Sequence, residues 1–326
     1  MFDVLVAGHL CVDIIPQIPP ESASSSNFLA PGRLTEVGAA IISTGGAVSN
    51  TGLALYKLGL HIGLVARLGD DYIGDLTKTI IQEWDPSLTE HLFIAKGEPS
   101  SYTIVINPPG IDRTFLHCPG TNNTFGPEDI PSHLLEDTRI LHFGYPPLMR
   151  RMFADDGQEL TLIFQRAKAL GATTSLDMAM PDPTQPSGQA DWPAILRRVL
   201  PYVDFFLPSV EELLYMLHKE RYAELAEQVG PDKMIDALSP EEIHSLAQEV
   251  LGMGTKVLIC KLGHRGLYLR SGHSLNNMGR IDLQTPSTWE DRELWAPCFK
   301  TQVVGTVGAG DATIAGFLAG LLRGQS

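Results

Sequence analysis

The sequence has few cysteines, and none lie at a spacing that would build a structural site. Cys11, Cys118, Cys260 and Cys298 are the four in 326 residues, and no two of them form a CxxC pair. Zinc ribbons and disulfide frameworks need closely spaced or regularly patterned cysteines. We therefore expect neither. Sparse, separated thiols fit a reducing compartment, which predicts a cytoplasmic location.

Positive charge and long apolar runs are also scarce. Lys and Arg number 24 against 38 Asp and Glu, which gives a formal net charge of −14 at pH 7. Nucleic acids and anionic membranes attract basic surfaces, so we expect no nucleic acid and no membrane as partners. No apolar run is long enough to span a bilayer. Residues 1–8 lack a basic segment and predict a first strand rather than a signal peptide.

The chain does contain a repeated alternation of apolar runs and helical patterns. Hydrophobic residues make up 44% of it, enough for a sizeable core. Repeated β–α units predict one mostly parallel sheet covered by helices on both faces, and a single domain over residues 1–326. Strands are predicted at 2–7, 62–66, 140–143, 173–176, 205–207, 256–261 and 266–269, and helices at 47–58, 75–84, 158–170, 192–200, 211–219 and 240–251.

Three polar or proline-rich segments, 16–27, 181–191 and 283–292, are predicted to be loops or surface insertions. Between residues 100 and 116 the pattern alternates instead, around the turn Pro108-Pro109-Gly110. Such alternation predicts a β-hairpin inside an otherwise α/β chain. A hairpin of this kind could cover a cleft.

The most informative motif lies near the C-terminus, where Gly308-Ala309-Gly310-Asp311 separates a short apolar run from an apolar helix. Glycines let the backbone approach a ligand closely, and a helix N-terminus favours an anion such as a phosphate. A carboxylate beside that phosphate is well placed to take a proton from an attacking hydroxyl. The motif therefore indicates phosphoryl transfer to an alcohol. The alternative is that Asp311 is only an N-cap or first-turn acid of a buried helix.

Two well-known nucleotide motifs do not fit this turn. A Walker A loop would need Gly-Lys-Ser/Thr after the glycines, and none follows. A Rossmann fingerprint belongs at the first strand–helix turn of a βαβ unit, whereas these glycines lie close to the last residue, Ser326. A dehydrogenase of the Rossmann type is therefore disfavoured.

Further motifs each allow two interpretations. Asn50, after Gly45-Gly46 at a predicted helix start, carries donors and acceptors that suit sugar hydroxyls, or it belongs to an ordinary loop–helix junction. Asp13 follows the first strand, where clefts of open α/β sheets lie, or it simply forms a turn. Glu211 and Glu212, after Pro208-Ser209, can be plain first-turn charges. The segment from Lys261 through Gly263 to Gly266 can be a tight turn between strands.

Taken in order, these motifs resemble those of the ribokinase-like carbohydrate kinases, the PfkB family. The resemblance covers nearly the whole chain and rests on Asp13, Gly45-Gly46 with Asn50, Gly69-Asp70-Asp71, Asp177, Ser209 with Glu212, Leu262-Gly263 with Gly266, and Gly308-Ala309-Gly310-Asp311. It implies an α/β, ribokinase-like fold with a mostly parallel sheet flanked by helices. It also implies a small β-sheet lid formed by segments near 12–44 and 98–124. Because a lid with an exposed sheet face often pairs with another lid, a homodimer through the lid is a hypothesis.

The resemblance also implies roles for single residues in an ATP- and Mg²⁺-dependent sugar kinase. Asp311 would be the catalytic base. Gly308, Ala309 and Gly310 would form the anion hole. The substrate-binding residues would be Asp13, Gly45, Gly46 and Asn50, and the nucleotide-binding residues Ser209, Lys261, Gly263 and Gly266. Glu212 would hold Mg²⁺ through water.

The chain departs from the family pattern at several positions. Gly305 stands where the family usually has an Asp that contributes to a monovalent-cation site, which argues against activation by potassium. Ser209 replaces the usual Asn, and ribose-specific members have a carboxylate near the position of Tyr145. Family members normally continue beyond the position of Ser326 with helices over the adenine. Two alternatives follow: the chain is truncated here, or its nucleotide pocket is more open than usual.

Two alternatives remain beside a sugar kinase. A nucleoside kinase of the adenosine type would use Tyr102, Phe115 or Tyr145 to stack on a base. A binding member of the family that has lost activity would be favoured by Gly305, Ser209 and the short C-terminus, whereas Asp311 and the glycines before it argue against that.

Overall fold

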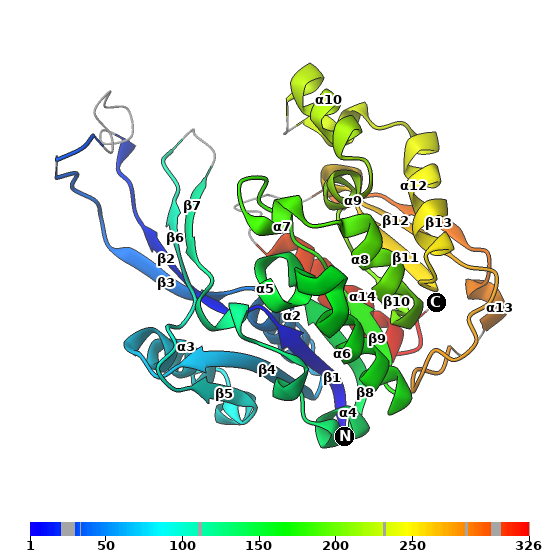
Figure 1. Cartoon of the computed structure of the whole chain (residues 1–326), viewed down its shortest axis with the longest axis horizontal. Coiled ribbons are helices and arrows are strands. Elements are labelled where there is room, and N and C mark those ends of the chain that lie inside the picture. Colours follow the sequence, from blue (N-terminus) through cyan, green and yellow to red (C-terminus); the bar gives the residue numbers. More distant parts are fainter. Residues whose placement is uncertain are drawn as a thin grey trace.

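The computed structural model describes residues 1–20, 30–32, 34–109, 113–230, 233–283, 286–300 and 308–325. Gly305, the apolar run at 303–304 and parts of the predicted loops and hairpin turn lie outside these described residues. Within them the chain folds around one large sheet and one small sheet (Figure 1). The predicted α/β architecture, a mostly parallel sheet with a second small sheet, is confirmed.

The large sheet has nine strands in the order β13-β12-β11-β10-β9-β8-β1-β4-β5. Neighbouring strands from β5 to β11 are parallel, and β12 and β13 are antiparallel additions at one edge. Their bounds are β1 (Phe2–Gly8), β4 (Ile62–Gly69), β5 (Leu92–Ala95), β8 (Thr138–Gly144), β9 (Thr173–Leu176), β10 (Phe205–Phe206), β11 (Val257–Lys261), β12 (Leu267–Ser271) and β13 (Glu293–Ala296).

Helices cover both faces of this sheet, because its strands are apolar on both sides. In β1, Leu5 and Ala7 belong to one buried cluster and Val4 and Val6 to another, since successive side chains point to opposite faces. The second cluster includes side chains of α2 (Ala47–Lys57), α3 (Tyr72–Gln82) and α14 (Ala309–Leu322). The first includes those of α4 (Ser132–Glu136), α5 (Arg150–Phe153), α6 (Gln158–Ala169), α8 (Trp192–Val199), α9 (Val210–Leu217), α10 (Lys219–Val229), α11 (Met234–Ala237) and α12 (Pro240–Gly252). Two further short helices are α7 (Pro186–Gln189) and α13 (Pro286–Trp289).

The small sheet projects from one end of the large one, at the left of Figure 1. Its strand order is β3-β2-β6-β7, with bounds β2 (Cys11–Pro16), β3 (Ala40–Gly45), β6 (Tyr102–Ile106) and β7 (Thr114–Cys118). The antiparallel pairing of β6 with β7 confirms the predicted hairpin. The register aligns Ser43, Asp13, Thr103 and His117 in one row across the four strands. Asp13, Thr103 and His117 therefore share one face of the small sheet.

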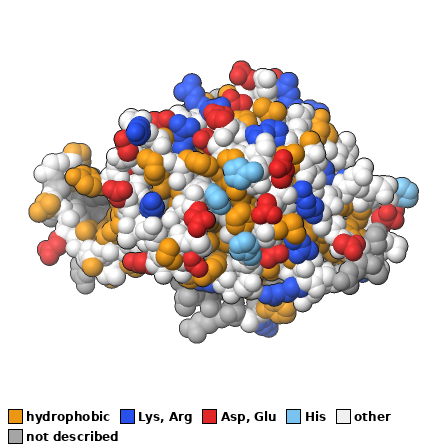
Figure 2. All heavy atoms as spheres, turned by 90° about the horizontal axis from the view of Figure 1, so that it is seen from below, with side chains coloured by type: hydrophobic (Ala, Val, Ile, Leu, Met, Phe, Trp, Pro, Cys, Tyr) orange, Lys and Arg blue, Asp and Glu red, His pale blue; other side chains and the backbone are white. Residues whose placement is uncertain are grey.

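The surface mixes charges of both signs. Acidic and basic side chains are interspersed on the face seen in Figure 2, and the small sheet at its left carries several hydrophobic side chains. In the part of the chain that the structure describes, no helix is long and apolar enough to cross a membrane.

Candidate functional site

The turn before α14 has the backbone geometry of an anion site. Gly308 is the N-cap residue, with a left-handed φ of 72° that a side chain would rarely tolerate. Among the residues that the structure describes, no side chain caps the helix. The N–H groups of the first turn therefore keep their hydrogen-bonding capacity, and the helix dipole adds partial positive charge there. Of the two structural roles weighed for Asp311, the N-cap is wrong, because Gly308 occupies that position, and the first-turn acid is confirmed.

Asp311 is buried, with 2% of its surface exposed, and three side chains donate hydrogen bonds to it. Asn50 Nδ2 lies 3.2 Å and the Tyr145 hydroxyl 2.7 Å from its Oδ2, and Thr51 Oγ1 lies 3.0 Å from its Oδ1. Asn50 and Thr51 belong to α2, which packs directly against α14. These contacts fix the orientation of the carboxylate beside the glycine turn.

Lys261 supplies a positive charge next to the same turn. Its Nζ lies 2.6 Å from Asp177 Oδ1, and both side chains are largely buried, 14% and 1% exposed. A Cβ placed on Gly310 would lie 3.6 Å from Lys261 Nζ, so the ammonium lies beside the first residues of α14. Burial alone would lower the pKa of Lys261, but the charges of Asp177 and Glu212 outweigh it and raise that pKa.

Asp177 has one oxygen without a protein partner. Its Oδ2 is buried and accepts no hydrogen bond from the described residues. Burial raises the pKa of Asp177 to about 8, against the opposing effect of Lys261. A buried carboxylate oxygen with free lone pairs is unusual. It fits a site in which a cation or a hydrogen-bond donor contacts this oxygen when the substrates are bound.

Ser209 and Glu212 form the N-terminal cap of α9. Glu212 N donates to Ser209 Oγ at 3.2 Å, and Ser209 N donates to Glu212 Oε2 at 2.7 Å, a capping box. Glu212 is thus a first-turn acid with a structural role, as one interpretation of the sequence expects. Its charge nevertheless acts on both Asp177 and Lys261, so it belongs to the same electrostatic cluster.

Gly263 and Gly266 shape the turn after β11. Their φ angles are 51° and 95°, and a Cβ on Gly266 would overlap the Ala296 carbonyl oxygen. Cys298 Sγ donates to the Gly263 carbonyl at 3.2 Å. Both glycines are therefore required by the fold of a tight turn. A role in nucleotide binding stays a prediction.

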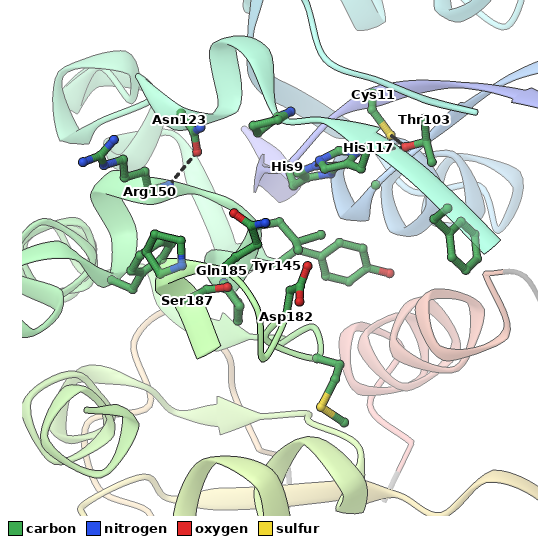
Figure 3. Close-up of a pocket in the computed structure, with 18 of the residues that line it drawn as sticks. His9, Cys11, Thr103, His117, Asn123, Tyr145, Arg150, Asp182, Gln185 and Ser187 are labelled. Carbon is green, nitrogen blue, oxygen red and sulfur yellow. Dashed lines mark hydrogen bonds between the residues drawn. The ribbon is translucent and has the colours of Figure 1, made fainter. Parts of the chain in front are cut away.

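A cavity of about 710 Å³ opens between the small sheet and the loops that follow β8 and β9 (Figure 3). Figure 3 shows His9 and His117 on one side of it and Tyr145, Asp182 and Gln185 on the other. Of the predicted substrate-binding residues, Asp13 and Gly46 line this cavity. Gly45 lies behind Asp13, and a Cβ on it would overlap the Asp13 carboxylate. Burial raises the pKa of Asp13 above its usual value.

A polar chain along the cavity is not predicted from the sequence. His9 Nε2 lies 3.4 Å from His117 Nε2, and His117 Nδ1 lies 3.0 Å from Thr103 Oγ1. Burial, with a smaller effect of His117, lowers the pKa of His9 to about 3, so His9 stays neutral at physiological pH. The only signal for His9 in the sequence is its place directly after the first strand, where ligand clefts lie.

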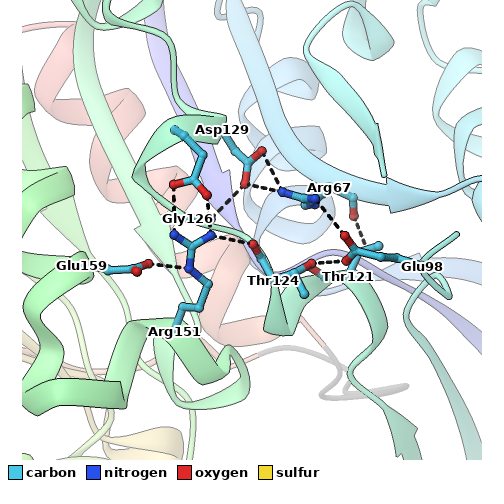
Figure 4. Close-up of polar contacts among 9 residues, drawn as sticks. Arg67, Glu98, Thr121, Thr124, Gly126, Asp129, Arg151 and Glu159 are labelled. Atoms are coloured by element: carbon cyan, nitrogen blue, oxygen red, sulfur yellow. Dashed lines mark hydrogen bonds and ion pairs between the residues drawn. The ribbon is translucent and has the colours of Figure 1, made fainter. Parts of the chain in front are cut away.

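An ion-pair network braces the outer wall of the cavity (Figure 4). Arg67 lies between Glu98, at 2.8 Å, and Asp129, at 3.3 Å. Arg151 donates to the Thr124 carbonyl at 2.9 Å and pairs with Glu159 at 2.6 Å. Since Asn123 and Arg150, neighbours of this network, line the cavity, the network holds the wall in place.

No group of three or more His, Cys, Asp or Glu side chains that could hold a metal ion occurs in residues 1–325 outside the gaps named above. A divalent ion in this site would therefore need ligands besides protein side chains, such as phosphate oxygens and water.

The sequence and the fold are similar to those of known carbohydrate kinases. The sequence model described as pfkB family carbohydrate kinase matches residues 1–326. An uncharacterized sugar kinase of Archaeoglobus fulgidus is 23% identical over 273 residues, 84% of this chain and 88% of that protein. Fructokinase-2 of Zea mays is 22% identical over 326 residues, 99% of this chain and 81% of its own.

Among solved structures, the ribokinase of Arabidopsis thaliana, complexed with ribose and ATP, shares the fold. Its TM-score is 0.71 at 18% identity, and the match covers 100% of this chain and 87% of that one.

Proposed function

Because this chain belongs to the pfkB family of carbohydrate kinases, we propose that it transfers the γ-phosphoryl group of ATP to a hydroxyl of a sugar, with Asp311 as the base. One observation carries the assignment of Asp311. Asp311 is a buried carboxylate in the first turn of α14, next to backbone N–H groups that no side chain of the described residues caps. An anion held by those groups would lie within reach of the carboxylate.

In the proposed reaction the acceptor hydroxyl donates a hydrogen bond to Asp311 and attacks the γ-phosphorus in line. The new O–P bond forms as the bond to the leaving ADP oxygen breaks, and the hydroxyl proton passes to Asp311. Asn50 and Thr51 keep the carboxylate oriented. Catalysis of this kind rests mainly on positioning and on charge stabilisation.

The residues at the turn fit a polyphosphate. Backbone N–H groups of Gly308, Ala309 and Gly310 would form the anion hole, and Lys261 would add a fixed positive charge beside them. Gly263 and Gly266 follow β11 directly after Lys261, and Ser209 pairs with Lys261 through a parallel bridge. These three residues are our candidates for contacts with the rest of the nucleotide.

A magnesium ion also fits the acidic side of this cluster. Mg²⁺ prefers carboxylate and phosphate oxygens and keeps several waters. Asp177 Oδ2 is free to accept such a contact, and Glu212 would act through water. When bound, the ion would neutralise charge on the phosphate oxygens. Gly305, at the usual monovalent-cation position, argues against potassium dependence.

The cavity is our candidate site for the sugar. Asp13, Gly46 and the neutral pair His9 and His117 offer acceptors and donors to hydroxyl groups. Gly45 lies behind Asp13, and Asn50 donates to Asp311. The small sheet forms one wall, so we propose that it acts as a lid built from residues 12–44 and 98–124. A closing lid would exclude water, which otherwise competes as acceptor.

A panel assay tests this function. ADP release with Mg-ATP is measured across pentoses, hexoses, sugar phosphates and nucleosides, with thermal-shift screening of the same compounds in parallel. We expect turnover that depends on a sugar. Binding without turnover for every acceptor would identify a member of the family that has lost activity.

A nucleoside is the second candidate acceptor, and one observation favours it. Phe115, 54% exposed on the small sheet, lines the cavity together with Tyr145. Aromatic faces of this kind stack on bases. If nucleosides are the substrates, Phe115→Ala will raise their KM and leave any turnover of free sugars unchanged.

The outer face of the small sheet is our candidate for a homodimer contact. The register aligns Ile42, Ile14, Ile104 and Leu116 in one row, opposite to the face with Asp13. Ile42 and Leu116 are 47% and 53% exposed. Light scattering at micromolar concentration should show a dimer that Ile42→Asp dissociates, and a monomeric wild-type protein would contradict this contact.

A further inference from the structure

Tyr145 has a backbone conformation that aromatic residues rarely adopt. Its φ of 66° and ψ of 42° lie in the left-handed region, directly after β8. Pro146 follows, and the residue before a proline is ordinarily extended. Such strain persists only where the surroundings impose it, and it points to a function for the strained residue.

The left-handed backbone at Tyr145 places its phenol between the cavity and Asp311. Tyr145 lines the cavity, and its hydroxyl lies 2.7 Å from Asp311 Oδ2. Asp311 itself is only 2% exposed. The phenol therefore stands between the cavity and the carboxylate that we assign as the base.

Hydrogen bonds already occupy most of that carboxylate. A carboxylate offers about four lone-pair sites. Asn50 and Tyr145 take two on Oδ2, and Thr51 takes one on Oδ1. An acceptor hydroxyl must donate the same kind of short bond to the base before it loses its proton. The phenol thus makes the bond that the acceptor would make.

The phenol also keeps its proton. Burial and the negative charges of Asp311 and Asp177 raise the pKa of Tyr145 well above its ordinary value. Tyr145 remains a hydrogen-bond donor to Asp311 over the whole physiological pH range.

We propose that the Tyr145 hydroxyl occupies the hydrogen-bonding position on Asp311 that the acceptor hydroxyl needs. We call this contact a latch: a sugar hydroxyl displaces the phenol from the base, and water does not. This proposal rests on the proposed role of Asp311. A sugar gains contacts with Asp13 and Gly46 that offset the loss of the bond between the phenol and Asp311, whereas a water molecule gains none of them. The latch therefore suppresses hydrolysis of ATP in the absence of an acceptor.

The test is Tyr145→Phe, which removes the hydroxyl and keeps the ring. We expect ADP release without acceptor to rise about tenfold, the scale of one hydrogen bond to a charged group. We also expect the acceptor, titrated calorimetrically with a non-hydrolysable ATP analogue, to bind more tightly. Tyr56→Phe is the matched control, because Tyr56 donates to Asp85 at 3.2 Å outside the cavity, and it should change neither quantity.

Two other results separate the possible failures. If Tyr145→Phe lowers acceptor turnover and leaves both hydrolysis and acceptor affinity unchanged, Tyr145 only orients Asp311 and the latch is refuted. If Asp311→Asn keeps normal turnover, the proposed role of Asp311 itself is wrong, whatever Tyr145→Phe does.

Discussion

Lys261 Nζ lies 2.6 Å from Asp177 Oδ1, although the two residues are 84 positions apart in the sequence. Lys261 is the last residue of β11, and Asp177 directly follows β9, with β10 between the two strands. The parallel order of the sheet thus brings a buried ammonium and a buried carboxylate together at the strand ends, beside the start of α14.

Removing the lysine should affect both stability and activity. In Lys261→Met the buried carboxylate of Asp177 loses its partner, and breaking a buried pair in this way costs about 3–5 kcal/mol. The double variant Lys261→Met/Asp177→Asn should recover most of the melting temperature but none of the turnover. Recovery of turnover in the double variant would show that the ammonium serves the fold alone.

A methyl group at Gly45 should weaken sugar binding. A Cβ there would overlap the Asp13 carboxylate and push it from its place in the cavity wall. We expect Gly45→Ala to raise the KM for the acceptor at least ~10-fold, as expected when a substrate-orienting group is displaced. Gly316→Ala is the control: nothing lies within 4 Å of its added Cβ, so it should leave the KM unchanged and stabilise α14 by about 0.5–1 kcal/mol.

The frame of this fold follows from its sequence, because the central strands are short apolar runs bounded by glycine or polar residues. The predicted strand at 2–7 differs from β1 by one residue, and the predicted helix at 192–200 differs from α8 by one residue. These elements are buried on one or both faces, so hydrophobic pattern alone determines them.

The small sheet is harder to predict. The hydrophobic pattern does not predict β2 and β3, which only the family resemblance implies as part of a lid near 12–44. Cys11–Pro16 and Ala40–Gly45 are half-exposed strands with polar residues, and β2 ends in a proline. The sequence predicts that Asp311 lies at the start of a helix, and the glycine motif before it indicates the role of a base. It cannot show the bond from Tyr145, 166 positions away, since that bond depends on how β8 meets α14 and on a left-handed residue that local preferences disfavour.

The strain at Tyr145 predicts an inverted order of stability for two small substitutions. Alanine at φ 66° keeps a Cβ penalty that glycine does not have. The free energy of unfolding of Tyr145→Gly should therefore exceed that of Tyr145→Ala by about 1 kcal/mol, and Tyr145→Gly should unfold at the higher temperature. At an ordinary helical or extended position alanine would be the more stable of the two.

Acid should destabilise the fold through His142. Burial, with a contribution from Lys261, lowers the pKa of His142 to about 3, from a usual value near 6.5. Below pH 6.5 the His142 imidazole is protonated in the unfolded chain but stays neutral in the folded chain. The stability from this group is therefore complete above pH 6.5 and falls by roughly 1.4 kcal/mol per pH unit as pH drops towards 3.

Melting temperatures measured between about pH 7 and pH 4 check this dependence. The pKa of His9 is lowered to about 3 as well, so His142→Gln should reduce the decline by the contribution of one histidine and the further change His9→Gln should reduce it again. His273→Gln, at an exposed surface position, should not reduce it. An equally steep decline in His142→Gln would assign the acid sensitivity to other groups.

The central claim is that Asp311 is the base of a sugar kinase, and Asp311→Asn tests it most directly. Acceptor-dependent ADP release is measured for this variant and for the wild-type protein with the best acceptor of the panel, and ATP binding is measured by calorimetry in both. The account predicts turnover at least ~100-fold lower with ATP affinity nearly unchanged, since a general base contributes about 10²–10⁴ to the rate. Near-normal turnover in Asp311→Asn would contradict it.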